Sequence, residues 1–144
     1  MTIKGWAATA ANRPLEPFEY DPGPLGADDV EVAVEHCGIC HSDASMMSNE
    51  WGITTYPIIP GHEVIGKVVA LGSNAKGLTV GQRVGIGWAS GNCMHCEQCV
   101  SGDGNLCPQG QATIVGRHGG FADRVRVQWP WAAPFRMGSA PEMR

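Results

Sequence analysis

Four cysteines within one short stretch could bind a single metal ion. They follow the spacing C-x2-C-x2-C-x7-C, at Cys93, Cys96, Cys99 and Cys107. Zinc accepts four thiolates in a tetrahedron, and a closed shell of four cysteines leaves no coordination position for a substrate. The spacing therefore predicts a structural zinc site, which by itself indicates no reaction.

Two other uses of these cysteines compete with zinc. Disulfides require an oxidising compartment, and the N-terminus lacks the charged-then-apolar pattern of a secretory signal. A ferredoxin-type iron–sulfur run has three residues before its fourth cysteine, whereas Cys107 follows a gap of seven. An iron–sulfur cluster would colour the protein brown, and zinc would leave it colourless.

A second group combines a thiol, an imidazole and a carboxylate. Cys40 lies in the segment 37–43, and His62 and Glu63 follow about twenty residues later. All three side chains are competent zinc ligands, and three protein ligands leave a position open, as in catalytic sites. A metal there would polarise an alcohol or carbonyl oxygen and lower the pKa of a bound hydroxyl. The alternative is a turn histidine beside a solvated glutamate.

The elements that must position these residues are mostly strands. In residues 30–35 three valines alternate with Glu31, Ala33 and Glu35, which is typical of a half-exposed strand. Further strands are predicted at residues 64–69, 82–87 and 122–127. The only predicted helix follows Cys40 and is short, with Ser42 or Asp43 as its N-cap.

Composition and charge exclude several classes of protein. The chain has 144 residues, a formal net charge of -4 and no basic run, which disfavours binding to nucleic acid or to an anionic membrane. It has no apolar run of about 18 residues, so a soluble, cytoplasmic protein without a membrane span is expected. No G-x-G-x-x-G lies between a strand and a helix, and a dinucleotide-binding Rossmann domain is therefore not expected in this chain.

Taken together, the motifs resemble the zinc-dependent medium-chain alcohol dehydrogenase family, in its cinnamyl-alcohol-dehydrogenase-like branch. Residues 61–72 match the family signature G-H-E-x-x-G-x5-G, residues 37–43 are similar to its first-ligand segment, and the four cysteines have its structural zinc spacing. The resemblance implies a mainly β fold. It would be a GroES-like, partly open β-barrel with a zinc lobe over residues 1–134, followed by an irregular tail at 135–144.

The resemblance also implies residue roles. Cys40 and His62 would ligate a catalytic zinc, with Glu63 as the neighbouring carboxylate. Ser42 would accept the proton of the alcohol, and Asp43 would orient a ligand. In addition, His41 would face the pyrophosphate of NAD or NADP bound to a separate Rossmann domain, and Trp51 and Trp88 would either line the substrate cleft or pack in the core.

The implied activity is NAD(P)-linked oxidation of primary alcohols or reduction of aldehydes, with two zinc sites and a small-molecule substrate. Homo-oligomerisation is left open. This chain departs from the family pattern at Ser45, where the family has a proton-relay histidine, and the family's third strong zinc ligand, a cysteine, lies beyond Arg144. We therefore expect the chain alone to bind zinc but to turn over poorly. The alternative is a free-standing zinc-binding β-domain without activity.

Overall fold

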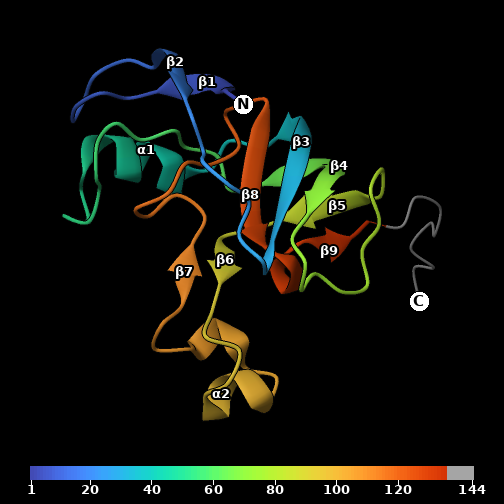
Figure 1. The fold of residues 1–144 in the computed structure, drawn as a ribbon. Coiled ribbons are helices and arrows are strands. Elements are labelled where there is room, and N and C mark those ends of the chain that lie inside the picture. The colour runs from blue at the N-terminus through green and yellow to red at the C-terminus, as the bar shows by residue number, and fades with distance from the viewer. Residues whose placement is uncertain (136–144) are drawn as a thin grey trace, which may run out of the picture.

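The computed structural model describes residues 1–135, and its main feature is a five-stranded antiparallel sheet. Its order is β8-β3-β4-β5-β9 (Figure 1). The bounds of these strands are β3 Asp29–Cys37, β4 Val64–Leu71, β5 Arg83–Ile86, β8 Arg124–Gln128 and β9 Ala133–Pro134. Branched side chains on one face of this sheet form the larger core cluster, which includes Val30, Val32, Val64, Val68, Val84, Ile86, Val125 and Val127.

Two short antiparallel ribbons accompany the main sheet. One pairs β1 (Ile3–Ala7) with β2 (Glu16–Tyr20), and the other pairs β6 (Ala89–Gly91) with β7 (Gln111–Ala112). In Figure 1 the β1–β2 hairpin lies at one end of the molecule, and the lobe that carries the cysteines extends from β6 and β7 at the other. The three sheets do not merge into a closed barrel. This agrees with the predicted mainly β, partly open architecture.

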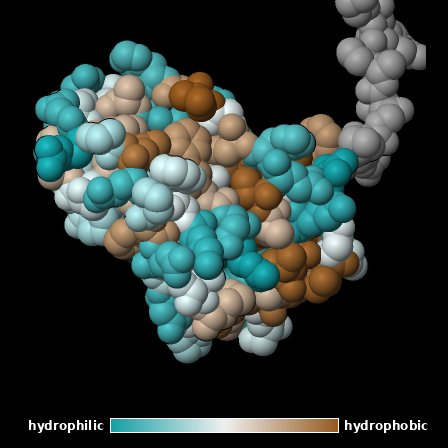
Figure 2. All heavy atoms as spheres, turned by 90° about the horizontal axis from the view of Figure 1, so that it is seen from above, coloured by the Kyte–Doolittle hydropathy of each residue, from teal (hydrophilic) through white to brown (hydrophobic). Residues whose placement is uncertain are grey.

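Helical structure is limited to short segments. The α-helices are α1 (His41–Ser48) and α2 (Glu97–Val100), and single 3₁₀ turns occupy Gly104–Leu106 and Trp129–Trp131. No helix within residues 1–135 is both long and apolar enough to cross a membrane. In the view of Figure 2, hydrophilic residues cover much of the surface, and hydrophobic residues lie both singly and in a group at the lower right.

The structure corrects two details of the predicted helices. The helix after Cys40 begins at His41, and its N-cap is Cys40 rather than Ser42 or Asp43. The reason is that Asp43 acts from the third helical position, where its Oδ2 accepts a hydrogen bond from the Cys40 N–H at 3.0 Å. The prediction of a single helix is also wrong, because α2 forms a second one inside the cysteine stretch.

Close strand pairing explains one glycine of the sheet. Gly66 in β4 faces Val34 of β3, and a Cβ at this position would overlap the Ala33 carbonyl oxygen and lie 2.7 Å from Val32 Cγ1. Two register shifts in the β3–β4 pair, one of them between Val34 and His36, accompany this approach. They lie close to Cys37, where β3 ends and the segment that carries Cys40 begins.

At the C-terminal end, sheet pairing continues slightly beyond β9. The Phe135 N–H donates a hydrogen bond to the Arg83 carbonyl oxygen at 2.9 Å. The remainder of the predicted tail, residues 136–144, lies outside the described residues.

Candidate metal centres and active site

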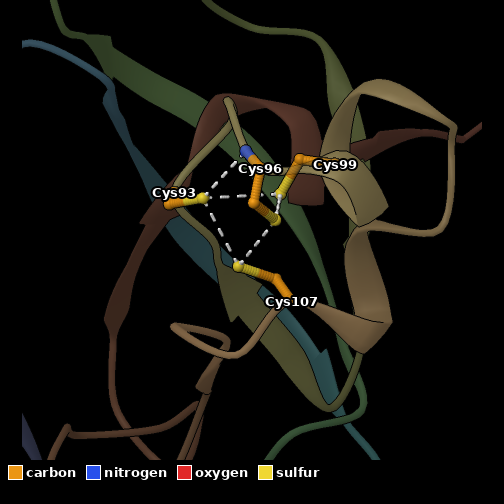
Figure 3. Close-up of side chains that lie close together, drawn as sticks. All are labelled: Cys93, Cys96, Cys99 and Cys107. Carbon is orange, nitrogen blue, oxygen red and sulfur yellow. Dashed lines mark hydrogen bonds between the residues drawn. The ribbon is translucent and has the colours of Figure 1, made fainter.

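The four cysteines of the lobe converge as their spacing predicts. The Sγ–Sγ distances are 3.9 Å for Cys93–Cys99, 3.5 Å for Cys96–Cys99, 3.8 Å for Cys96–Cys107 and 3.6 Å for Cys107–Cys93 (Figure 3). Four sulfur atoms at about 2.3 Å from one zinc ion lie about 3.8 Å apart in a regular tetrahedron. The donor set and its size therefore fit zinc. All four cysteines are free of disulfides.

Backbone N–H groups of the lobe donate hydrogen bonds to two of the four sulfur atoms. The Cys96 N–H donates to Cys93 Sγ at 3.3 Å, and the Gln109 N–H donates to Cys107 Sγ at the same distance. Hydrogen bonds from the backbone of His95 and Cys96 lower the pKa of Cys93 to about 6. Since the thiolate is the form that binds metal, this sulfur is prepared as a ligand near neutral pH.

The second predicted ligand set also meets in space. One ligand atom each from Cys40, His62 and Glu63 lies within 4.8 Å of the other two. His62 is buried, Cys40 is half-buried and Glu63 is exposed. A zinc ion with bonds of about 2.0–2.3 Å can be reached from this arrangement by small side-chain movements, and the donors are a thiol, an imidazole and a carboxylate. The set therefore fits a zinc ion with one side open.

Glycines at two positions allow this convergence. Gly61, directly before His62, has φ of +98°, and a Cβ there would lie 2.8 Å from Cys37 Sγ and 2.6 Å from Phe121 Cδ1. A Cβ at Gly38 would overlap the Glu63 carboxylate. The Gly38 N–H also donates to the Glu63 carbonyl oxygen at 2.9 Å, which ties the two ligand segments together.

One carboxylate connects both ligand segments to α1. Asp43 Oδ1 lies 3.1 Å from His62 Nδ1 and accepts a hydrogen bond from the Gly61 N–H at 2.8 Å. Its Oδ2 accepts from the Cys40 N–H, as described above. Asp43 is 2% exposed, so few water molecules compete for it. With the Nδ1 proton donated to Asp43, the Nε2 atom of His62 remains available for a metal.

The other predicted site residues lie around α1. Ser42 Oγ is 3.6 Å from Cys40 Sγ, so the hydroxyl borders the ligand set. His41 is exposed at the first position of α1 and belongs to neither ligand group. Ser45, in the place of the family's relay histidine, is buried and donates to Glu50 Oε2 at 2.7 Å. Hydrogen bonds from Ser45 and Ser48 lower the pKa of Glu50. Sequence reasoning missed this pairing, because no motif connects the two residues.

Two tryptophans extend the site on one side. The Trp88 ring meets the His62 ring edge-on, with centroids 5.1 Å apart, and Trp51 meets Trp88 in the same way at 6.0 Å. Trp51 is 47% exposed and Trp88 is 40% exposed. Their exposure excludes the core-packing interpretation. They form an aromatic wall beside the buried His62.

Cys37 has a different environment from Cys40. Its side chain packs against the main core cluster, and burial raises the pKa of its thiol. A thiol that resists ionisation is a poor metal ligand. This agrees with the assignment of Cys40, and not Cys37, to the ligand set.

Comparison with known proteins identifies the family. The profile of the alcohol dehydrogenase GroES-like domain matches residues 26–137. This chain belongs to that family. Aldehyde reductase AdhA of Synechocystis sp. is 57% identical over 126 residues, covering 88% of this chain and 38% of that protein. Cinnamyl alcohol dehydrogenase 7 of Arabidopsis thaliana is 41% identical over 128 residues, covering 84% of this chain and 36% of that protein.

Solved structures of alcohol dehydrogenase GroES-like domains superpose closely. A cinnamyl alcohol dehydrogenase from Sorghum bicolor aligns with a TM-score of 0.88 and 34% identity, over 95% of this chain and 41% of that one. The Helicobacter pylori enzyme solved in complex with NADP(H) aligns with a TM-score of 0.85 and 26% identity, over 93% and 41%. This chain therefore spans about two-fifths of the length of these relatives. The expected family and GroES-like fold are confirmed.

Proposed function

We propose that this chain is the zinc-binding catalytic part of an alcohol dehydrogenase that interconverts primary alcohols and aldehydes with NAD or NADP. The observation that carries the proposal is the convergence of Cys40, His62 and Glu63 around one point, with Asp43 hydrogen-bonded to the two segments that supply them. The names of the relatives agree with this class of substrate. Residues 1–134 would form the domain, and the Rossmann domain that holds the cofactor would lie outside this chain.

Each residue around the ligand set would have a separate role in the reaction. Zinc held there supplies a Lewis acid that polarises the substrate oxygen and lowers the pKa of an alcohol. Ser42, 3.6 Å from the ligand sulfur, would take the proton that an alcohol loses. Asp43 would hold His62 in the tautomer that presents Nε2. His41, exposed at the start of α1, would contact the cofactor phosphates, since helix N-termini attract anions.

The aromatic wall would define the apolar side of the substrate site. Trp88 contacts His62 and Trp51 contacts Trp88, so an apolar substrate group next to the metal would lie against indole faces. Such contacts exclude water from the reacting carbon and strengthen local electrostatic interactions. Cytoplasmic location and self-association remain predictions from the sequence.

Metal content of the purified 144-residue chain tests the proposal. We expect two zinc ions per chain, and replacement by cobalt(II) would give thiolate-to-metal absorption from both sites. The Cys40→Ser variant should retain only the ion of the four-cysteine site, and the Cys99→Ser variant should lose that ion.

The alternative, an inactive zinc-binding β-domain, makes the opposite prediction for Cys40. One ion per wild-type chain, with unchanged metal content in Cys40→Ser, would overturn the catalytic assignment. It would leave the four-cysteine site intact.

A further inference from the structure

A cavity of about 540 Å³ borders Trp88. Its walls come from the α1–β4 connection, the β6–β7 ribbon and the loop that follows β7, namely Ile53, Trp88, residues 110–112 and residues 115–117. Trp88 is shared, because its ring also meets His62 at 5.1 Å. Trp88 therefore borders both the cavity and the proposed metal site.

Arg117 is the only residue lining this cavity that carries a formal charge, and it is held in place by neutral groups. Its Nη1 donates to Gln111 Oε1 at 2.6 Å and its Nη2 donates to the Arg126 carbonyl oxygen at 2.8 Å. Within residues 1–135 no carboxylate forms an ion pair with it. These two hydrogen bonds use two of the five N–H donors of the guanidinium.

The neighbouring charges do not neutralise Arg117. The nearby strand β8 carries Arg124 and Arg126, and both are paired with the single carboxylate of Glu31, at 2.7 and 2.8 Å. Both guanidinium groups of β8 therefore share one carboxylate. Arg117 donates to neutral oxygen atoms, and its positive charge borders the cavity.

We propose that Arg117 binds a carboxylate at the distal end of the substrate, so that the preferred substrates are aldehydes or alcohols that also carry an acid group. This inference rests on the proposed function, since it places the reacting end of the same molecule beside His62. The apolar middle of the substrate would contact Trp88 and Ile53. A guanidinium held by two hydrogen bonds loses little side-chain entropy when it binds a planar carboxylate.

The test uses an aromatic aldehyde with a carboxylate and the same aldehyde with that carboxylate converted to a neutral methyl ester. The zinc-loaded 144-residue chain would be titrated with 4-formylbenzoate and with its methyl ester, and binding would be followed by quenching of tryptophan fluorescence. We expect the acid to bind about tenfold more tightly or better, because a charge-assisted hydrogen bond is lost in the ester. The difference should shrink as ionic strength rises.

Two substitutions of Arg117 distinguish the effect of its charge from the effect of its shape. Arg117→Gln should remove the preference for the acid and leave the affinity for the ester unchanged, whereas Arg117→Lys should retain part of the preference. Circular dichroism and the unfolding midpoint verify that each variant is folded. As a second measurement, the NMR signal of the Arg117 Nε–H should shift on addition of the acid and not of the ester. Equal affinities in the wild type, or a preference that survives in Arg117→Gln, would overturn the inference.

Failure of the proposed function gives a different result. If the preference for the acid depends on Arg117 but Cys40→Ser neither loses a metal ion nor weakens binding of the aldehyde, the carboxylate site stands and the catalytic assignment falls. If both metals are present and the two ligands bind equally, only the Arg117 inference falls.

Discussion

At the scale of single residues, Asp43 holds several groups of the candidate metal site in place. It is buried in α1, yet its two oxygens reach the backbone at Cys40 and Gly61 and the ring of His62. Each of these contacts fixes a group next to a proposed metal ligand. The carboxylate therefore acts on metal binding without being a ligand itself.

We expect Asp43→Asn to weaken zinc binding at the Cys40–His62–Glu63 site by about 10- to 100-fold. The amide keeps the shape of the side chain but removes the charge that favours the Nδ1–H tautomer of His62. Competition with a chromogenic chelator would measure the two zinc sites separately, with the four-cysteine site as an internal reference. Glu19→Gln, which changes an exposed carboxylate on β2, is the matched control and should bind like the wild type. Equal zinc affinity in Asp43→Asn would contradict this role.

The environment of His118 disfavours the protonated, charged form of its imidazole. Its ring packs 4.4 Å from Tyr20 and 5.9 Å from Phe18, and its Nδ1 is buried without a hydrogen-bond partner in residues 1–135. Burial lowers its pKa below the ordinary value of 6.5. The folded chain therefore keeps this imidazole neutral at a pH where the unfolded chain already takes up a proton.

It follows that His118 costs stability as the pH falls through 6.5, because the unfolded state then binds more protons than the folded state. NMR titration of the His118 ring should give a midpoint below 6.5. Urea unfolding of wild type and His118→Gln at pH 7.5 and pH 5.5 should show a smaller loss of stability in the variant. A midpoint at or above 6.5 would refute the assignment.

At the scale of elements, strands β3 and β8 are joined by a buried ionic contact. Glu31 on β3 is 2% exposed and is paired with Arg124 and Arg126 on β8. Arg126 Nη1 also donates to the carbonyl oxygens of Pro22, Gly23 and Pro24. The cluster therefore connects the strand pair to the segment between β2 and β3.

Removing this carboxylate should be costly. We expect Glu31→Ala to lower the free energy of unfolding by about 3 kcal/mol, since it leaves two guanidinium groups without their common partner. Glu35→Ala on the same strand is the control, because Glu35 pairs with Arg83 and Lys67 near the surface, where solvent screens ion pairs, and its loss should cost clearly less. Urea denaturation of the two variants gives the comparison, and similar losses would contradict the argument.

The burial of Glu31 could not be predicted from the alternation of residues along the strand. Alternation along residues 30–35 correctly predicts β3 and the valine face, but it assigns Glu31 to solvent. The structure buries this side chain beside Arg124 and Arg126, which pair with it from more than 90 residues away in the sequence. The strands β1 and β2 were missed for a related reason, since β2 contains Pro17 and is partly exposed.

The candidate site was easier to predict than the fold around it. Cysteine spacing and the G-H-E signature identify ligand residues directly, because metal coordination restricts residue type and separation. Arg117 carries no such signal: its relation to Trp88 depends on how the loop after β7 folds against β6. The pairing of Ser45 with Glu50 likewise depends on how the chain turns at the end of α1.

At the scale of the whole molecule, the cysteine lobe has little core of its own. Neither α2 nor the following 3₁₀ turn contains a buried residue, and Val100 and Leu106 are 72% and 65% exposed. The main sheet, by contrast, has a continuous cluster of buried valines. A metal bound by the four cysteines would therefore supply most of the stability of the lobe.

Removal of zinc should unfold the lobe and spare the sheet. Hydrogen exchange measured by mass spectrometry should accelerate strongly for peptides covering residues 93–108 after chelation, while peptides from β3 and β4 stay protected. Zinc added back should restore protection. Uniform acceleration over the whole chain would show instead that the lobe and the sheet unfold together.

The two ends of the cysteine lobe are adjacent, because they are the paired strands β6 and β7. Gly91 and Gln111 are directly paired, so the polypeptide leaves the body of the molecule and returns to it at one place. Everything between these two positions is, in topological terms, an insert that a tight hairpin turn could replace. The whole insert could therefore be replaced by another one, in evolution or by protein engineering, without a change in the path of the remaining backbone.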